Sequence, residues 1–118
     1  MIAVSNTRIE HFPGKGRGVV ACRDFDDDDV IESAHVIEIP VQLLRSDSLF
    51  KHSMAWDNAH DCIALGHMML LNHSSNPNCK TRNDFEKRTK TLYAIRPIAE
   101  GDELTVDYGV PLWFDAVE

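Results

Sequence analysis

The chain has 118 residues and a formal net charge of −7, with 12 Lys and Arg against 19 Asp and Glu. This length suits one domain, which can bury a hydrophobic core without the help of disulfides or metals. The acidic balance argues against a nucleic-acid-binding protein, because such a protein needs basic side chains to displace counterions from phosphates. It suits a basic protein partner through complementary charge.

The three cysteines are Cys22, Cys62 and Cys79, an odd number at wide spacing. They form no CxxC pair, so we expect reduced, mostly buried thiols and neither a disulfide framework nor a structural zinc site. The stretch 1–8 is too short and polar for a signal peptide, and no apolar run approaches the ~20 residues that span a bilayer. A cytoplasmic protein without membrane contact is therefore the expectation.

The first half of the chain predicts short strands between loops. Residues 13–18 contain three glycines and predict a loop, followed by a strand over 19–22. The aspartates at 26–29 predict a solvated turn, because their spacing lacks the alternation of a calcium-binding loop. The β-branched residues from 30 to 39 predict one or two strands that end at Pro40.

The second half continues this pattern. Residues 62–65 and 67–71 are apolar runs, too short for periodicity to assign them to helix or strand. The Asn- and Ser-rich stretch 72–78 predicts a loop, whereas 89–95 and 104–106 predict strands. Many short strands and little helix indicate a compact β-rich domain.

Three segments carry groups suited to chemistry. Gly14–Gly18 would let a ligand approach the backbone closely, although taken alone it reads more simply as a hairpin turn. Leu71–Cys79 places an Asn-His pair at the edge of an apolar run, where polar groups need partners. Glu100–Gly109 carries Tyr108, for which a core aromatic and a functional residue are equally good interpretations.

No metal site is expected. His67 and His73 could meet at one ion, but no carboxylate stands at a supporting helical spacing. A lone histidine is more often a hydrogen-bonded structural residue than a ligand.

The order of the three segments, GxGxG, then NHSxxPNC, then GDELTVDYG, resembles the SET domain of protein lysine methyltransferases. The NHS…PN and ELTxDYG blocks are the most specific signatures, and residues 25–32 and 95–101 are similar to SET sequence as well. The chain looks like the minimal single-domain SET proteins of bacteria and large viruses. We therefore expect residues 1–118 to form a single SET domain with its core at about 7–113.

The resemblance implies a mostly β fold of the SET type, a β-clip. It implies several small antiparallel sheets, short helices and a C-terminal segment that passes the NHS loop in a knot-like crossing. It also implies methyl transfer from S-adenosyl-L-methionine to the ε-amine of a lysine in a basic protein substrate, with no direct nucleic-acid contact. Minimal SET proteins sometimes form homodimers, so a dimer stays open.

Residue roles follow from the same resemblance. The backbone of residues 15–17 would lie along the methionine part of the cofactor, Asn72 would bind its polar end, and His73 would contact the adenine. Tyr108 is the expected catalytic residue, whose hydroxyl would orient the lysine amine, and main-chain carbonyls near Leu71 would contact the methyl group. The expected cofactor-binding residues are Lys15, Gly16, Arg17, Asn72, His73, Tyr108 and Trp113.

The substrate channel departs from the family pattern. Many SET enzymes carry aromatic residues at the positions that correspond to Ala34 and Thr81. The channel is therefore expected to be wider, which favours higher methylation states, or to be lined by Trp56 or Tyr93. The expected channel residues are Ala34, Thr81, Tyr108 and Trp113.

Two other interpretations stay open at this point. One is a SET-fold module that binds cofactor or peptide without catalysis, and the other is an unrelated β-rich interaction domain. Binding of S-adenosylmethionine would exclude the unrelated interaction domain. A methylation assay would then distinguish an active methyltransferase from a SET-fold module without catalysis.

Overall fold

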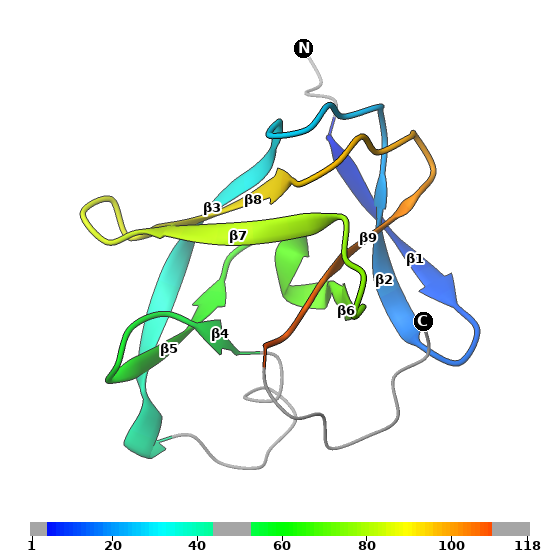
Figure 1. Cartoon of the computed structure of the whole chain (residues 1–118). Coiled ribbons are helices and arrows are strands. Elements are labelled where there is room, and N and C mark those ends of the chain that lie inside the picture. The colour runs from blue at the N-terminus through cyan, green and yellow to red at the C-terminus, as the bar shows by residue number, and fades with distance from the viewer. Residues whose placement is uncertain (1–4, 44–52, 110–118) are drawn as a thin grey trace.

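Two sheets make up most of the computed structural model, which describes residues 5–43 and 53–109. The four-stranded sheet has the order β1-β2-β9-β6 and the five-stranded sheet the order β4-β5-β3-β8-β7 (Figure 1). The expected mostly β fold with several small sheets and short helices is thus confirmed. The elements are β1 (Thr7–Phe12), β2 (Gly16–Ala21), β3 (Val30–Pro40), η1 (Val41–Leu43), β4 (Met54–Ala55), β5 (His60–Ala64), η3 (His67–Leu70), β6 (Asn72–His73), β7 (Cys79–Asp84), β8 (Thr89–Ala94) and β9 (Glu103–Val106), where η denotes a 3₁₀ helix.

The hairpin of β1 and β2 explains two of the glycines in the first motif. Gly14 and Gly16 have φ angles of 81° and 77°, a backbone conformation that glycine adopts without steric cost. The prediction of a loop is therefore correct for the turn but wrong for residues 16–18. These residues belong to β2, because pairing with β1 satisfies their backbone groups.

Strand β9 joins segments that are far apart in sequence. It pairs antiparallel with β2 and parallel with β6, so that Asn72 lies opposite Thr105. The loop after β6 is fastened to β9 by Asn78, whose side-chain amide donates to the Glu103 carbonyl at 2.9 Å and accepts from Thr105 N–H at 2.9 Å. Strand β9 thus runs beside the NHS segment (Figure 1), and the knot-like crossing of the C-terminal segment stays a prediction.

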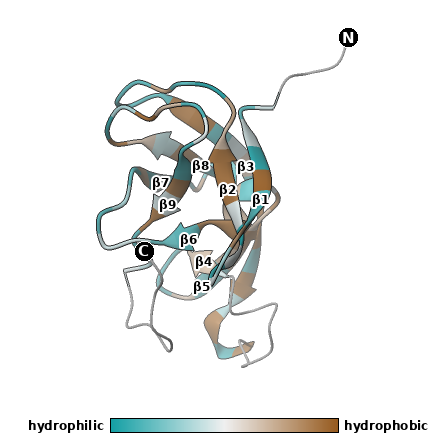
Figure 2. Ribbon diagram, turned by 90° about the vertical axis from the view of Figure 1, so that its right-hand side faces the viewer, coloured by the Kyte–Doolittle hydropathy of each residue, from teal (hydrophilic) through white to brown (hydrophobic). Residues whose placement is uncertain are grey.

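The core lies where the two sheets and η3 meet. Its largest fully buried side chains include Phe25, Met68, Leu92 and Leu104. Figure 2 shows hydrophobic residues along the strands at the centre of the molecule and hydrophilic residues on the loops around them. Two of the three free cysteines are fully buried and Cys22 is half-buried, as predicted.

A buried lysine links the two edge strands of the five-stranded sheet, β4 and β7. Lys90 on β8 is 3% exposed, and its ammonium donates to the Ala55 carbonyl and to Asn83 Oδ1, both at 2.8 Å. Asn83 Nδ2 in turn donates to the Trp56 carbonyl at 3.0 Å. Burial lowers the pKa of Lys90. The short strand β4 pairs with β5, and these side-chain bonds link it in addition to β7 and β8.

Sequence patterns identified the central strands better than the edges. The apolar runs at 62–65 and 67–71 become β5 and η3, and the predicted strands at 89–95 and 104–106 become β8 and β9. The four edge strands β1, β4, β6 and β7 were not predicted, and the loop predicted at 72–78 is wrong for residues 72–73, which form β6. Strands β4 and β6 have two residues each, and the mostly polar residues of β1 and β7 show no clear apolar alternation. No helix in the described part of the chain is long and apolar enough to cross a membrane.

We expect Asn78→Ala to lower the free energy of unfolding by about 2–4 kcal/mol, because it removes the acceptor of the buried Thr105 N–H and the donor to the Glu103 carbonyl. Asn76→Ala in the same loop is the matched control, since Asn76 is exposed and should change stability by less than about 0.5 kcal/mol. Urea denaturation measures both. Equal stabilities of the two variants would show that Asn78 does not fasten this loop to β9.

Candidate active site

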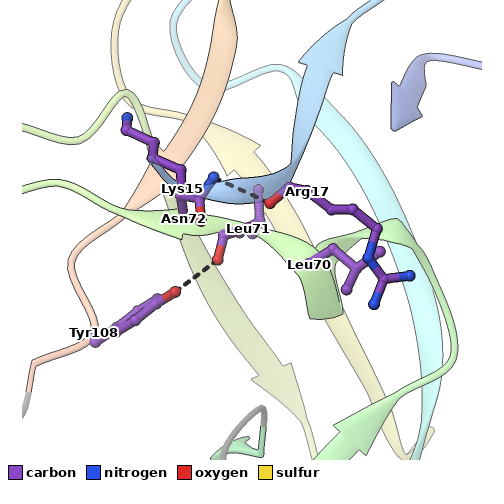
Figure 3. A pocket seen from close by; sticks show the side chains of 6 residues that line it. All are labelled: Lys15, Arg17, Leu70, Leu71, Asn72 and Tyr108. Atoms are coloured by element: carbon purple, nitrogen blue, oxygen red, sulfur yellow. Dashed lines mark hydrogen bonds between the residues drawn. The ribbon is translucent and has the colours of Figure 1, made fainter. Parts of the chain in front are cut away.

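One pocket draws on all three motifs found in the sequence. Its volume is about 210 Å³ (Figure 3). Four of the predicted site residues lie around it, together with two leucines that lead into β6. The lining residues are Lys15, Arg17, Leu70, Leu71, Asn72 and Tyr108.

Both the hydroxyl and the backbone N–H of Tyr108 donate hydrogen bonds to residues in or next to β6. Its hydroxyl donates to the Leu71 carbonyl at 2.8 Å, and its backbone N–H donates to His73 Nδ1 at 3.0 Å. The rings of His73 and Tyr108 lie 5.1 Å apart. Burial, together with the negative charge of Glu103, raises the pKa of the Tyr108 hydroxyl. Tyr108 is therefore a neutral hydrogen-bond donor at physiological pH.

The orientation of the Asn72 amide follows from its two partners. Nδ2 donates to the Arg17 carbonyl at 3.2 Å (Figure 3). It also donates to Glu103 Oε2 at 2.8 Å. With both amide protons engaged, Oδ1 is the atom of Asn72 that can accept a hydrogen bond from a ligand.

Glu103 joins Asn72 to Lys15. Its Oε1 lies 2.9 Å from Lys15 Nζ, and the two side chains are 15% and 14% exposed. Gly18 makes room for this arrangement, because a Cβ there would lie 2.8 Å from both Asn72 Nδ2 and Glu103 Oε2. It would also lie 2.7 Å from Phe12 Cε2. The third glycine of the first motif is thus required by packing rather than by a turn.

Other predicted site residues lie away from this pocket or outside the described residues. Gly16 is the turn residue that begins β2, and His73 supports Tyr108 without lining the pocket. Ala34 is buried in the core on β3, and Thr81 lies on β7. Trp113 lies outside the described residues. The adenine contact of His73 and the channel roles of Ala34, Thr81 and Trp113 stay predictions.

The two aromatic residues named as alternative channel linings are engaged elsewhere in the structure. Trp56 is buried, and its ring packs edge-on against Phe85 at a centroid distance of 4.9 Å. Tyr93 lies beneath the guanidinium of Arg82 at 5.1 Å. Neither residue lines the pocket.

Sequence reasoning missed two features of the site. Glu103 and Gly18 both belong to the quoted motifs, yet no role was assigned to the Glu103 side chain or to the missing side chain of Gly18. The signal was present in the glutamate of GDELT and in the last glycine of GxGxG. Their contact became visible only once β2, β6 and β9 were placed side by side.

The two histidines considered as metal ligands have different hydrogen-bond partners. His67 Nδ1 lies 2.7 Å from the Thr7 hydroxyl, whereas His73 Nδ1 accepts from Tyr108. Within residues 5–43 and 53–109, the ligand atoms of Glu38, Asp57 and His60 lie within 4.8 Å of one another. They are already paired inside the protein, since His60 bonds Asp57 at 2.9 Å and Arg88 bonds Glu38 at 2.7 Å.

Comparison with solved structures identifies the class of fold. The chain superposes on the crystal structure of a candidate histone methyltransferase of Plasmodium falciparum with a TM-score of 0.74. The match covers 95% of this chain and 100% of that chain at 22% sequence identity. This similarity establishes the fold.

Comparison with protein families and curated proteins identifies the family as well as the fold. The model of the SET domain family matches residues 16–109, so the chain belongs to the SET domain family, a family of protein lysine methyltransferases. A histone-lysine N-methyltransferase of Schizosaccharomyces pombe, H3 lysine-37 specific, is 27% identical over 105 residues, covering 86% of this chain and 71% of the relative. N-lysine methyltransferase KMT5A-A of Xenopus laevis is 35% identical over 121 residues, and the match covers 86% of this chain and 36% of the relative.

We expect Gly18→Ala to weaken binding of S-adenosylmethionine at least about fivefold, because the new Cβ would displace the Asn72 and Glu103 side chains. Calorimetric titration measures the affinity. Gly101→Ala is the control without a packing conflict: no atom lies within 4 Å of an added Cβ there, although Gly101, unlike Gly18, has a positive φ of 91°. That variant should lose stability without losing affinity, and equal affinities in both variants would contradict the packing argument.

Proposed function

We propose that this chain transfers a methyl group from S-adenosyl-L-methionine to the ε-amine of a lysine in a protein substrate. The observation that carries the proposal is the position of Tyr108, whose hydroxyl bonds the Leu71 carbonyl one residue from Asn72 at the rim of the pocket. A phenol and a carbonyl at this distance can fix an amine, because the phenol oxygen and the carbonyl oxygen both accept its N–H bonds.

The groups of the pocket fit one end of the methyl donor. Its amino acid end carries a carboxylate and an ammonium, which need cationic donors and polar acceptors. The ammonium of Lys15 and the guanidinium of Arg17 can supply the first, and Asn72 Oδ1 the second. When bound, S-adenosylmethionine supplies a methyl group already activated on a positive sulfur. The volume of about 210 Å³ is below the ~300 Å³ typical of small ligand pockets, so these residues account for part of the ligand.

The chemical requirement on the substrate is a neutral amine. Free lysine has a pKa of about 10.4, so neutralising it at pH 7 costs about 4.6 kcal/mol. Entry into a partly buried site disfavours the ammonium form. Alignment of the amine with the methyl group supplies much of the remaining rate enhancement.

Tyr108 would orient the amine rather than deprotonate it. Its raised pKa keeps the hydroxyl protonated, so it cannot serve as a base at neutral pH. Its backbone contact with His73 and its hydroxyl contact with Leu71 restrict the ring, which favours a fixed position for the bound amine.

The substrate class rests on the relatives and on charge. One relative is named for a histone lysine. The net charge of −7 would attract a basic, lysine-rich protein segment. A cytoplasmic location, a homodimer and the absence of direct nucleic-acid contact remain predictions from the sequence.

The test is a methylation assay with isotopically labelled S-adenosylmethionine and a panel of basic proteins, histones included, followed by mass spectrometry of the modified lysines. Label on lysine supports the proposal. Cofactor binding without label on any protein of the panel or of the source cell lysate would favour the alternative, a SET module that has lost catalysis.

We expect Tyr108→Phe to lower kcat at least about 100-fold while the affinity for S-adenosylmethionine stays within about threefold, since only the amine-orienting hydroxyl is lost. The chain contains one other tyrosine, so Tyr93→Phe is the natural control and should retain kcat. Full activity of Tyr108→Phe would end the assignment of Tyr108 as the catalytic residue.

A further inference from the structure

Glu103 contacts two residues of the pocket but does not line it. One carboxylate oxygen bonds Lys15 Nζ at 2.9 Å, and the other bonds Asn72 Nδ2 at 2.8 Å. The pocket is lined by Lys15 and Asn72 themselves. Any effect of Glu103 on a ligand must therefore act through these two neighbours.

The burial of this ion pair is unusual for the molecule. Among the ion pairs of the described residues, Lys15 and Glu103 are the only two partners that are both less than 20% exposed. A buried ion pair adds little to stability, because removing both charges from water costs about as much as their attraction returns. Stability alone therefore gives a weak reason for placing this pair at the pocket.

Each carboxylate oxygen of Glu103 positions a different residue of the pocket. The bond to Lys15 sets where the ammonium lies, and the bond to Asn72 sets which way the amide faces. Without an acceptor at Oε2, the Asn72 amide could rotate and offer its NH₂ group where a ligand ammonium needs an oxygen. The space for this arrangement exists because residue 18 has no side chain.

We propose that Glu103 is a positioning residue that holds Lys15 and Asn72 in a preformed contact set for the amino acid end of S-adenosylmethionine. This inference rests on the proposed function. The negative charge of Glu103 also raises the pKa of Tyr108, which agrees with its place beside the pocket.

The two tasks can be separated by substitution. Glu103→Gln keeps an oxygen that can accept from Asn72 but removes the charge that holds Lys15. Glu103→Ala removes both contacts. We expect the dissociation constant for S-adenosylmethionine to rise about tenfold in Glu103→Gln and further in Glu103→Ala, with a smaller change in kcat at saturating cofactor.

A double-mutant cycle tests whether Glu103 affects the affinity for S-adenosylmethionine through Lys15. In a Lys15→Met background, Glu103→Gln should change the dissociation constant less than about twofold, because its effect passes through Lys15. Glu10→Gln is the matched control, since it removes the same charge from an exposed ion pair with Arg8 on β1, and it should leave the affinity unchanged.

The outcomes distinguish this inference from the proposed function. If the wild-type chain does not bind S-adenosylmethionine, both the proposed function and the positioning role of Glu103 are wrong. Wild-type binding together with unchanged affinity in Glu103→Gln, or a full effect that persists in the Lys15→Met background, would overturn the positioning role alone. Circular dichroism and thermal unfolding establish that each variant is folded at the titration temperature. If Glu103→Ala does not fold, the nearly isosteric Glu103→Gln carries the test.

Discussion

The double pairing of β9 is the constraint on which the site depends. A strand of four residues joins β2 along one edge and β6 along the other, so it brings together three sequence motifs that are otherwise dozens of residues apart. Asn78 holds the loop after β6 against this strand, and Tyr108 follows two residues beyond the end of β9. Without the parallel pairing to β6, the hydroxyl of Tyr108 would have no fixed relation to Asn72.

The three glycines of the first motif are needed for two different physical reasons. Gly14 and Gly16 have left-handed backbone conformations that form the turn, whereas Gly18 is needed for the space that its missing side chain leaves. The turn presents Lys15 to the pocket, and the space at Gly18 lets Glu103 reach both Lys15 and Asn72. A spacing of glycines alone does not distinguish these reasons.

Much of the site could be predicted from the sequence, because its residues lie in short contiguous motifs of strong composition. Lys15, Arg17, Asn72 and Tyr108 were expected together and line one pocket. Glu103 could not be assigned, since its role depends on a contact between β9 and the β1–β2 turn that no local pattern encodes. The edge strands β1 and β7 were missed for a different reason: most of their side chains are exposed or half-buried on both faces, so their sequences lack the apolar alternation by which a strand is recognised. The channel positions Ala34 and Thr81 rest on family correspondence alone, and the pocket does not include them.

The burial of Lys90 has a consequence for the lysines of the protein itself. Because its pKa is lowered, Lys90 has a larger fraction of the neutral, nucleophilic amine than an exposed lysine at the same pH. Yet that amine is 3% exposed and engaged by Ala55 and Asn83, so no alkylating reagent reaches it while β4 stays in place. Lys90 is thus protected from self-modification by the fold, and chemical labelling of this one residue would report local opening of β4 away from β8.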